Sequence, residues 1–264
     1  QMRLRGQYLT KNDCYQTDRT ISVRGVMVHS TGADNPRVSR YVPGDGEMGR
    51  NTAGNHWDRP GLTKCVHAFV GGFADGEAGT VQTLPWEHRG WHAGGAANNT
   101  HIGFEICEDG LDDPVYFGKV YREAAELTAM LCRKFSLDPL ADGVVICHAE
   151  GHERSVASNH GDVLHWFPKM GKSMDDFRAD VASLIKDGQS PDPEEPEGGD
   201  EDVTYEQWKE FMDRYRRELS QRPAPEWGRE ELEQAKALGF TDGKRPQDLA
   251  SRQEVASMIL RAQE

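Results

Sequence analysis

The sequence lacks any hydrophobic run long enough to cross a membrane. No stretch of about 18 apolar residues occurs among its 264 residues, so no transmembrane helix is expected. The first 20 residues, QMRLRGQYLTKNDCYQTDRT, also lack the apolar core of a secretory signal. If the protein acts outside the cytoplasm, either a leader has been removed or another route releases it.

The sequence also lacks closely spaced cysteines. Its five cysteines lie far apart and form no CxxC pair: Cys14, Cys65, Cys107, Cys132 and Cys147. An odd number at this spacing argues against a disulfide framework and against a cysteine-rich zinc site. We therefore expect the chain to fold in a reducing compartment.

A basic stripe is missing as well, and the chain carries a net charge of −13. Residues 187–202, DGQSPDPEEPEGGDED, hold eight acidic residues and no Lys or Arg. The net charge is only −4 over residues 1–186 and −1 over residues 203–264. Most of the acidity therefore belongs to one short segment, and the pattern disfavours nucleic-acid binding.

The acidic segment divides the chain into two parts. A run rich in Pro, Gly, Glu and Asp buries little apolar surface and is typical of an extended linker. We therefore predict a domain of residues 1–186, a linker of residues 187–202 and a C-terminal module of residues 203–264.

The first domain alternates strand-like and helical patterns. Short runs rich in β-branched and aromatic residues predict strands within residues 24–30, 65–71, 80–85, 101–108 and 143–148. Apolar residues at helical spacing predict helices over residues 119–135 and 174–186, the second capped by Ser173 with Asp176. This alternation predicts an α/β domain with a largely buried sheet.

The C-terminal module shows only helical patterns. Thr204 with Gln207 forms a capping-box pattern ahead of a first helix. Pro225 is placed to open a second helix, and Ser251 a third. About sixty residues form only a small core, so we expect a compact all-helical module.

Two of the ten histidines end strand-like runs, His29 in GVMVHS and His148 in GVVICH. If these strands are neighbours, both imidazoles lie at the same end of a sheet. The loop ASNHGDVLHWFP, residues 157–168, then offers His160, Asp162 or His165 as a third ligand. Three protein ligands with one open position are the arrangement of catalytic zinc. Spacing alone does not choose among the three loop residues.

Glu105 lies within an otherwise apolar strand, HIGFEICE. Strand alternation places Ile102, Phe104 and Ile106 on one face and Glu105 on the other. A carboxylate is costly to bury unless it is paired or takes part in chemistry. Glu105 is therefore either a solvent-facing residue of a one-sided sheet or a general base beside a metal site.

Four motifs together resemble the type 2 N-acetylmuramoyl-L-alanine amidases, a family that includes many phage endolysins and is related to the peptidoglycan recognition proteins. They occur in the family's order across residues 20–186: VMVHSTG, HAFVGGFADGEAGTVQTLPWEHRGWHAGG, NNTHIGFEICE and CHAEGHERSVASNHGDVLHWFP. The resemblance implies a central mixed β-sheet flanked by helices. It also implies one zinc ion in a groove that holds the peptidoglycan stem peptide.

The same motifs imply the metal ligands. His29 of VHST matches the first zinc ligand, His148 of CHAE the second, and Asp162 the third. Val163-Leu164 stands where the family usually has Pro-Gly, which keeps His160 and His165 open as alternatives for the third ligand.

Further roles follow from the resemblance. Glu105 matches the catalytic base, and His160 stands two residues before the third ligand, where the family places a group that stabilises the oxyanion. Trp91 and His92 match the WHAG residues that lie beside the substrate groove.

The C-terminal stretch ALGFTDGKRPQDLASRQEVASMILRA resembles half of a surface-layer-homology repeat and the short modules that end many clostridial-type endolysins. The resemblance implies wall attachment or self-association through residues 203–264. A helical cap without a ligand is the alternative.

The sequence thus predicts zinc-dependent hydrolysis of the amide bond between N-acetylmuramic acid and L-alanine in peptidoglycan. We expect a phage or prophage endolysin, made in the cytoplasm and reaching the wall through a membrane lesion or from outside. Peptidoglycan is the expected partner, with neither nucleic acid nor membrane. The alternative is a non-catalytic peptidoglycan-binding protein of the same fold.

Overall fold

The computed structural model describes residues 2–187, 205–225, 228–248 and 255. The chain divides into two compact units, Gln1–Asp192 and Pro193–Glu264. The predicted linker, residues 187–202, lies almost wholly outside the described residues. No helix of the described residues is long and apolar enough to cross a membrane.

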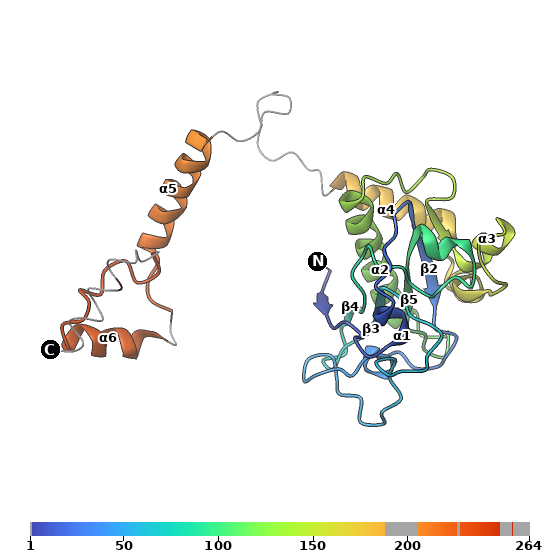
Figure 1. The fold of residues 1–264 in the computed structure, drawn as a ribbon, viewed down its shortest axis with the longest axis horizontal. Helices are drawn as coiled ribbons and strands as arrows, with labels where there is room; N and C mark the ends of the chain where they lie inside the picture. Colours follow the sequence, from blue (N-terminus) through green and yellow to red (C-terminus); the bar gives the residue numbers. More distant parts are fainter. Residues whose placement is uncertain (1, 188–204, 226–227, 249–254, 256–264) are drawn as a thin grey trace. The chain divides into compact units, whose positions relative to one another are not determined.

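A six-stranded mixed sheet forms the centre of the first unit (Figure 1). The spatial order is β1-β4-β3-β5-β2-β6; only β3 and β4 pair antiparallel. The strand bounds are β1 Leu4–Gly6, β2 Gly25–Ser30, β3 Ala68–Gly72, β4 Ala78–Gln82, β5 His101–Ile106 and β6 Val145–Cys147. The predicted mixed sheet flanked by helices is therefore confirmed.

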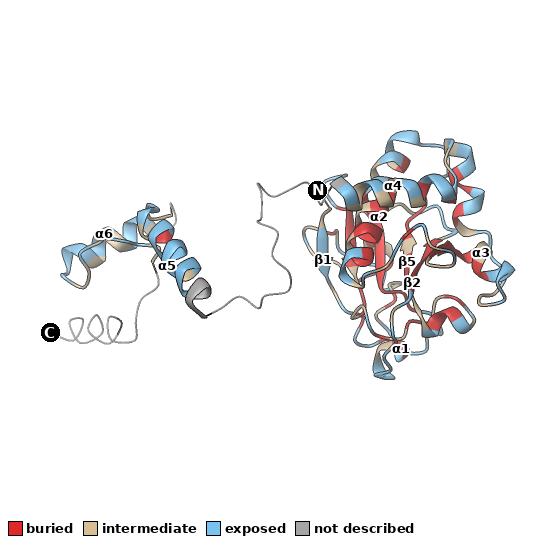
Figure 2. Cartoon of the chain, turned by 90° about the horizontal axis from the view of Figure 1, so that it is seen from above, coloured by how far each residue is buried: buried red, intermediate tan, exposed pale blue. Residues whose placement is uncertain are grey.

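Helices α2 (Pro114–Lys134) and α4 (Met174–Asp187) pack together against one face of the sheet (Figure 2). Asp113 caps α2 by accepting hydrogen bonds from the first-turn backbone, and Pro114 suits the first helical position. These two residues explain why α2 begins five residues before the predicted start. The Ser173–Asp176 cap of α4 forms as predicted, with Ser173 N donating to Asp176 Oδ2 at 2.8 Å.

The opposite face of the sheet is covered mainly by short elements and irregular segments. They bury a second apolar cluster that includes Leu9, Tyr41, Trp57 and Phe69. The short elements of the first unit are α1 (Asp13–Gln16), η1 (Val38–Arg40), η2 (Ala96–Asn99), α3 (His148–Glu153), η3 (Asp162–His165) and η4 (Phe167–Met170). The candidate site lies on this face, because alternation points His29 and Glu105 away from α2.

The shortest elements of the first unit carry no sequence signal. β1 is an exposed three-residue strand at the edge of the sheet, and α1 has four residues, so neither carries a readable period. His148 is also not the last residue of a strand: β6 ends at Cys147, and His148 is the first residue of α3.

The second unit contains α5 (Tyr205–Gln221) and α6 (Arg229–Ala237). Both fall where helices were predicted, although α6 begins four residues after Pro225. Gly239, at φ 77°, follows the end of α6 in the left-handed conformation that often terminates helices. Thr204 and the predicted third helix from Ser251 lie outside the described residues, apart from Val255.

Candidate functional site

Parallel pairing brings the predicted site residues together at one end of the sheet. Strand β2 lies between β5 and β6, and His29 of β2 stands directly opposite Glu105 of β5. Val28 pairs with Cys147 at the end of β6, so His148 follows on the other side. Ligand sites of such sheets lie beyond the carboxyl ends of the strands, where these side chains are.

A capping box fixes His148 at the start of α3. The carboxylate of Glu150 accepts from the backbone N–H of Cys147 at 3.0 Å, which holds the first turn. Arg178 of α4 then binds Glu150 at 3.0 Å and donates to the carbonyl of Val145 at 3.0 Å. His148 is thus tied both to its strand and to the helix layer behind the sheet.

Asp162 reaches the two histidines from η3 with a left-handed backbone, at φ 44°. Aspartate is one of the few non-glycine residues that adopt this conformation readily. Val163, fully buried in the main core, anchors the turn directly after it. The Val163-Leu164 pair therefore builds this turn without the family's Pro-Gly.

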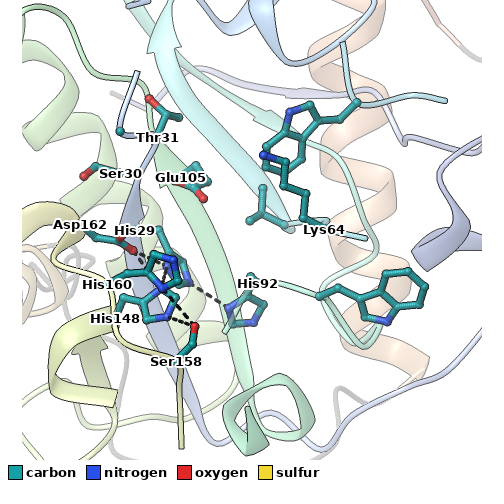
Figure 3. A pocket seen from close by; sticks show the side chains of 14 residues that line it. His29, Ser30, Thr31, Lys64, His92, Glu105, His148, Ser158, His160 and Asp162 are labelled. Atoms are coloured by element: carbon teal, nitrogen blue, oxygen red, sulfur yellow. Dashed lines mark hydrogen bonds and ion pairs between the residues drawn. The ribbon is translucent and has the colours of Figure 1, made fainter. Parts of the chain in front are cut away.

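Three polar atoms converge at this point (Figure 3). Asp162 Oδ2 lies 2.8 Å from His29 Nδ1 and 3.1 Å from His148 Nδ1, and the two Nδ1 atoms are 3.0 Å apart. Ligands of a tetrahedral zinc ion, at bonds of about 2.0–2.1 Å, are about 3.3 Å from one another. Two imidazole nitrogens and one carboxylate oxygen at this spacing could hold a metal ion.

Burial and hydrogen bonding set the charges of this group. Desolvation opposes ionisation of Asp162, but hydrogen bonds from His148 and His29 outweigh it and lower the pKa of the carboxyl group. Burial also lowers the pKa of His29, although the hydrogen bond and charge of Asp162 act to raise it. An ionised carboxylate beside a neutral imidazole is the protonation state that binds metal ions.

Glu105 of β5 lies beside this group, directly opposite His29. Its Oε2 is buried and has no hydrogen-bond partner within the described chain. Burial raises the pKa of Glu105 to about 8, the charge of Asp162 adds to the rise, and Lys64 opposes it. A buried, unpartnered carboxyl group with a raised pKa is typical of a functional acid or base.

His160 is exposed at the cavity, and one of its ring nitrogens, Nδ1, is hydrogen-bonded. Its Nδ1 lies 3.1 Å from the hydroxyl of Ser158, and its ring centroid lies 4.7 Å from that of His148. Its Nε2 makes no hydrogen bond to any residue that the structure describes, which leaves this nitrogen available to a ligand.

A cavity of about 280 Å³ opens over these groups. Trp91 and His92, predicted from the sequence, line it, and so do residues that the sequence analysis did not single out, namely Trp57, Lys64, Thr31 and Ser158. Figure 3 draws Lys64 on the opposite side of the cavity from His148 and Asp162. Trp57 and Lys64 lie in a segment without a readable period, so no sequence signal marks them.

The rings of His92 and His165 both bond other residues of the chain. His92 does so through both ring nitrogens, and His165 through Nε2. His92 uses Nδ1 for His29, at 2.9 Å, and Nε2 for the carbonyl of His101, at 3.0 Å. This pattern shows that the ring of His92 supports His29, and its predicted place beside the substrate stays a prediction. His165 Nε2 lies 2.8 Å from buried Glu108, which links η3 to the end of β5.

Residues 19–163 match the model of a protein family described as N-acetylmuramoyl-L-alanine amidase. The fold is similar to that of Staphylococcus aureus hydrolase AmiA in complex with its ligand (TM-score 0.51, 17% identity, 72% of this chain and 86% of that one). A mutant endolysin from Bacillus subtilis is also similar (TM-score 0.47, 21% identity, 69% of this chain and 99% of that one). No curated protein matches the sequence. Because the matched residues span more than half of the sequence, the chain belongs to the N-acetylmuramoyl-L-alanine amidase family.

Proposed function

We propose that the protein is a zinc-dependent amidase that hydrolyses the bond between the lactyl group of N-acetylmuramic acid and L-alanine in peptidoglycan. The convergence of His29, His148 and Asp162 within 3.1 Å carries the proposal. Two nitrogen donors and one oxygen donor beside an open cavity suit a catalytic zinc ion. Zinc in such a site polarises a carbonyl group and lowers the pKa of water toward about 7.

Glu105 acts as the proton carrier. Its unpartnered Oε2 accepts a proton from the attacking water and passes that proton to the amine of L-alanine as the amide bond breaks. The raised pKa of the carboxyl group, about 8, shows how strongly this environment resists a negative charge. A cation held by His29, His148 and Asp162 would offset the charge of Asp162 and favour the ionised, proton-accepting form.

His160 stabilises the oxyanion. Its Nδ1 can accept the hydroxyl proton of Ser158, which leaves Nε2–H as a donor at the cavity. One well-placed donor to a developing oxyanion contributes on the order of 3 kcal/mol to the transition state. The joint presence of this donor, Glu105 and three metal ligands disfavours a non-catalytic binding protein.

Removal of metal tests the proposal directly. The wild-type protein is expected to release free L-alanine amino termini from purified cell walls, and a chelator is expected to stop this release. Added zinc should restore it, because the three ligands remain in place. Release that continues unchanged after exhaustive chelation would contradict the zinc dependence.

Lys64 is proposed to attract the carboxylate groups of the stem peptide. It is the one Lys or Arg among the described residues that line the cavity, and its Nζ lies 4.7 Å from the ring centroid of Trp57. Exposed ion pairs contribute about 0.2–1 kcal/mol, so Lys64→Met should raise KM about 1.4- to 5-fold on a substrate with a free carboxylate.

The matched substrates for this prediction are N-acetylmuramoyl-L-alanyl-D-isoglutamate and its amidated isoglutamine form. Wild type and Lys64→Arg should have a lower KM for the substrate with the free carboxylate than for the amidated one. Lys64→Met should have the same KM for both substrates. An unchanged preference in Lys64→Met would assign carboxylate recognition to another group.

Action as a phage or prophage endolysin at the cell wall remains a prediction. So does wall attachment or self-association through residues 203–264. In that unit α5 exposes Phe211 and Tyr215, one helical turn apart, which is compatible with either role.

A further inference from the structure

The loop that carries the WHAG motif connects to both His29 and His148 on the Nε2 side of their rings, away from Asp162. Each of these histidines turns Nδ1 toward Asp162 and Nε2 toward a second partner. The partner of His29 is the ring of His92, and the partner of His148 is the hydroxyl of Ser158, which in turn reaches the carbonyl of Ala93. The two support contacts therefore meet at adjacent residues, His92 and Ala93.

The hydrogen-bond chain through His92 determines the tautomer of His29. The carbonyl of His101 only accepts hydrogen bonds, so His92 Nε2, 3.0 Å away, must carry a proton. A neutral ring carries only that one proton, so Nδ1 of His92 is an acceptor, and it lies 2.9 Å from His29 Nε2. When a metal ion takes the place of the hydrogen bond between His29 Nδ1 and Asp162, His29 Nε2 donates to this acceptor and the lone pair of Nδ1 faces the metal.

Ser158 plays the corresponding part for His148. Its hydroxyl lies 3.1 Å from His148 Nε2 and 3.3 Å from the carbonyl of Ala93, and a second acceptor, His160 Nδ1, lies at 3.1 Å. The single hydroxyl proton is directed to one of these two acceptors. When a metal ion takes the place of the hydrogen bond between His148 Nδ1 and Asp162, the hydroxyl oxygen accepts from His148 Nε2–H and the lone pair of Nδ1 faces the metal.

The loop itself is held rigidly. Buried Asn98 accepts hydrogen bonds through Oδ1 from the backbone N–H groups of His92 and Ala93, both at 2.9 Å. The ring of His92 lies against the backbone of β5, where a Cβ on Gly103 would stand 2.3 Å from His92 Nδ1. Glycine at position 103 is therefore needed for this close approach.

We propose that His92 and Ser158 are positioning residues that hold His29 and His148 in the tautomer and orientation required for metal binding. They act through those histidines. Partners that orient a metal-binding histidine typically change metal affinity about 10- to 100-fold when they are removed. The inference rests on the proposed metal site. It gives the WHAG loop the role of raising the affinity of that site for its metal ion.

The test measures zinc affinity in the purified full-length protein by competition with a chromogenic chelator. His92→Leu removes the acceptor for His29 and should weaken zinc binding about 10- to 100-fold. His92→Gln supplies an amide oxygen for His29 and an amide N–H for the His101 carbonyl, so it should recover most of the affinity. Ser158→Ala, a small change in a loop, should weaken binding independently through His148.

His88→Leu is the matched control. His88 is also buried and bonds a backbone carbonyl, that of Cys14 at 2.9 Å, but it makes no contact with the metal-site histidines. Its loss should lower thermal stability and leave zinc affinity unchanged.

Two outcomes overturn the inference in distinguishable ways. If wild type binds zinc and both His92→Leu and Ser158→Ala bind it equally tightly, the positioning role is wrong and the proposed function stands. If wild type itself binds no zinc, the proposed function fails, and the positioning role fails with it.

Discussion

Replacing Glu105 with Gln is expected to lower the rate of peptidoglycan hydrolysis about 10²- to 10⁴-fold, the usual contribution of a general acid–base group. Gln has nearly the same shape but cannot take up the proton of the attacking water. The buried Oε2 of Glu105 has no other hydrogen-bond partner in the described chain, so the substitution breaks no contact that holds the fold. Removing a group whose pKa is raised to about 8 should also leave the sheet at least as stable.

Initial rates of amino-terminus release from purified walls measure this effect, together with zinc content and thermal stability. The expected pattern is a fall in kcat with KM and bound zinc unchanged, because Glu105 does not belong to the converging ligand group. Glu87→Gln, a change at an exposed glutamate outside the cavity, is the matched control. A Glu105→Gln variant that keeps more than a tenth of wild-type activity would show that another group carries the proton.

The regular strands explain why part of the site could be predicted from the sequence. Period-2 alternation placed Glu105 on the face opposite Ile102, Phe104 and Ile106, and the structure confirms that these three residues face the helix-covered core. Strand-like runs that end in His29 and His148 predicted both imidazoles at the same end of the sheet if the two strands are neighbours, and β2 and β6 are parallel neighbours. Periodicity within a buried sheet is thus sufficient to predict which side chains share a face.

The loops explain why the rest could not be predicted. Ser158, Trp57 and Lys64 reach the cavity from segments whose course depends on tertiary contacts, not on a repeating pattern. The contact of His92 with His29 could not be predicted from the sequence either, because it depends on which backbone carbonyl faces His92 Nε2. The burial of His88 is likewise set by tertiary contacts, because its ring stacks on Tyr15 and bonds the carbonyl of Cys14.

Asp162 is the ligand that the sequence left least certain, and its replacement should have the second large effect. Asp162→Asn is expected to weaken zinc binding more than 100-fold, beyond the 10- to 100-fold of a supporting residue. Asn tolerates the φ of 44° as Asp does, so the turn should persist while the charged oxygen is lost. Hydrolysis should fall with the zinc content.

The change in stability on adding zinc separates this effect from misfolding. At a zinc concentration 100 times Kd, binding stabilises the wild type by about 2.7 kcal/mol, a gain that Asp162→Asn should lack. The zinc-free variant should itself be less stable at neutral pH. The lowered pKa of Asp162 means that its ionised form stabilises the fold above the unfolded-state pKa, and this contribution is lost as pH falls through the folded-state pKa.

His160→Gln and His165→Gln complete the assignment of the third ligand. Both variants should retain the stability gain on adding zinc, because neither ring takes part in the 2.8–3.1 Å group around Asp162 Oδ2. His165→Gln should lower baseline stability, since it removes the partner of buried Glu108. His160→Gln should leave stability intact and reduce the hydrolysis rate. If the zinc-dependent gain disappeared in either of these variants and persisted in Asp162→Asn, the third ligand would be that histidine, and the left-handed turn at Asp162 would have only a structural role.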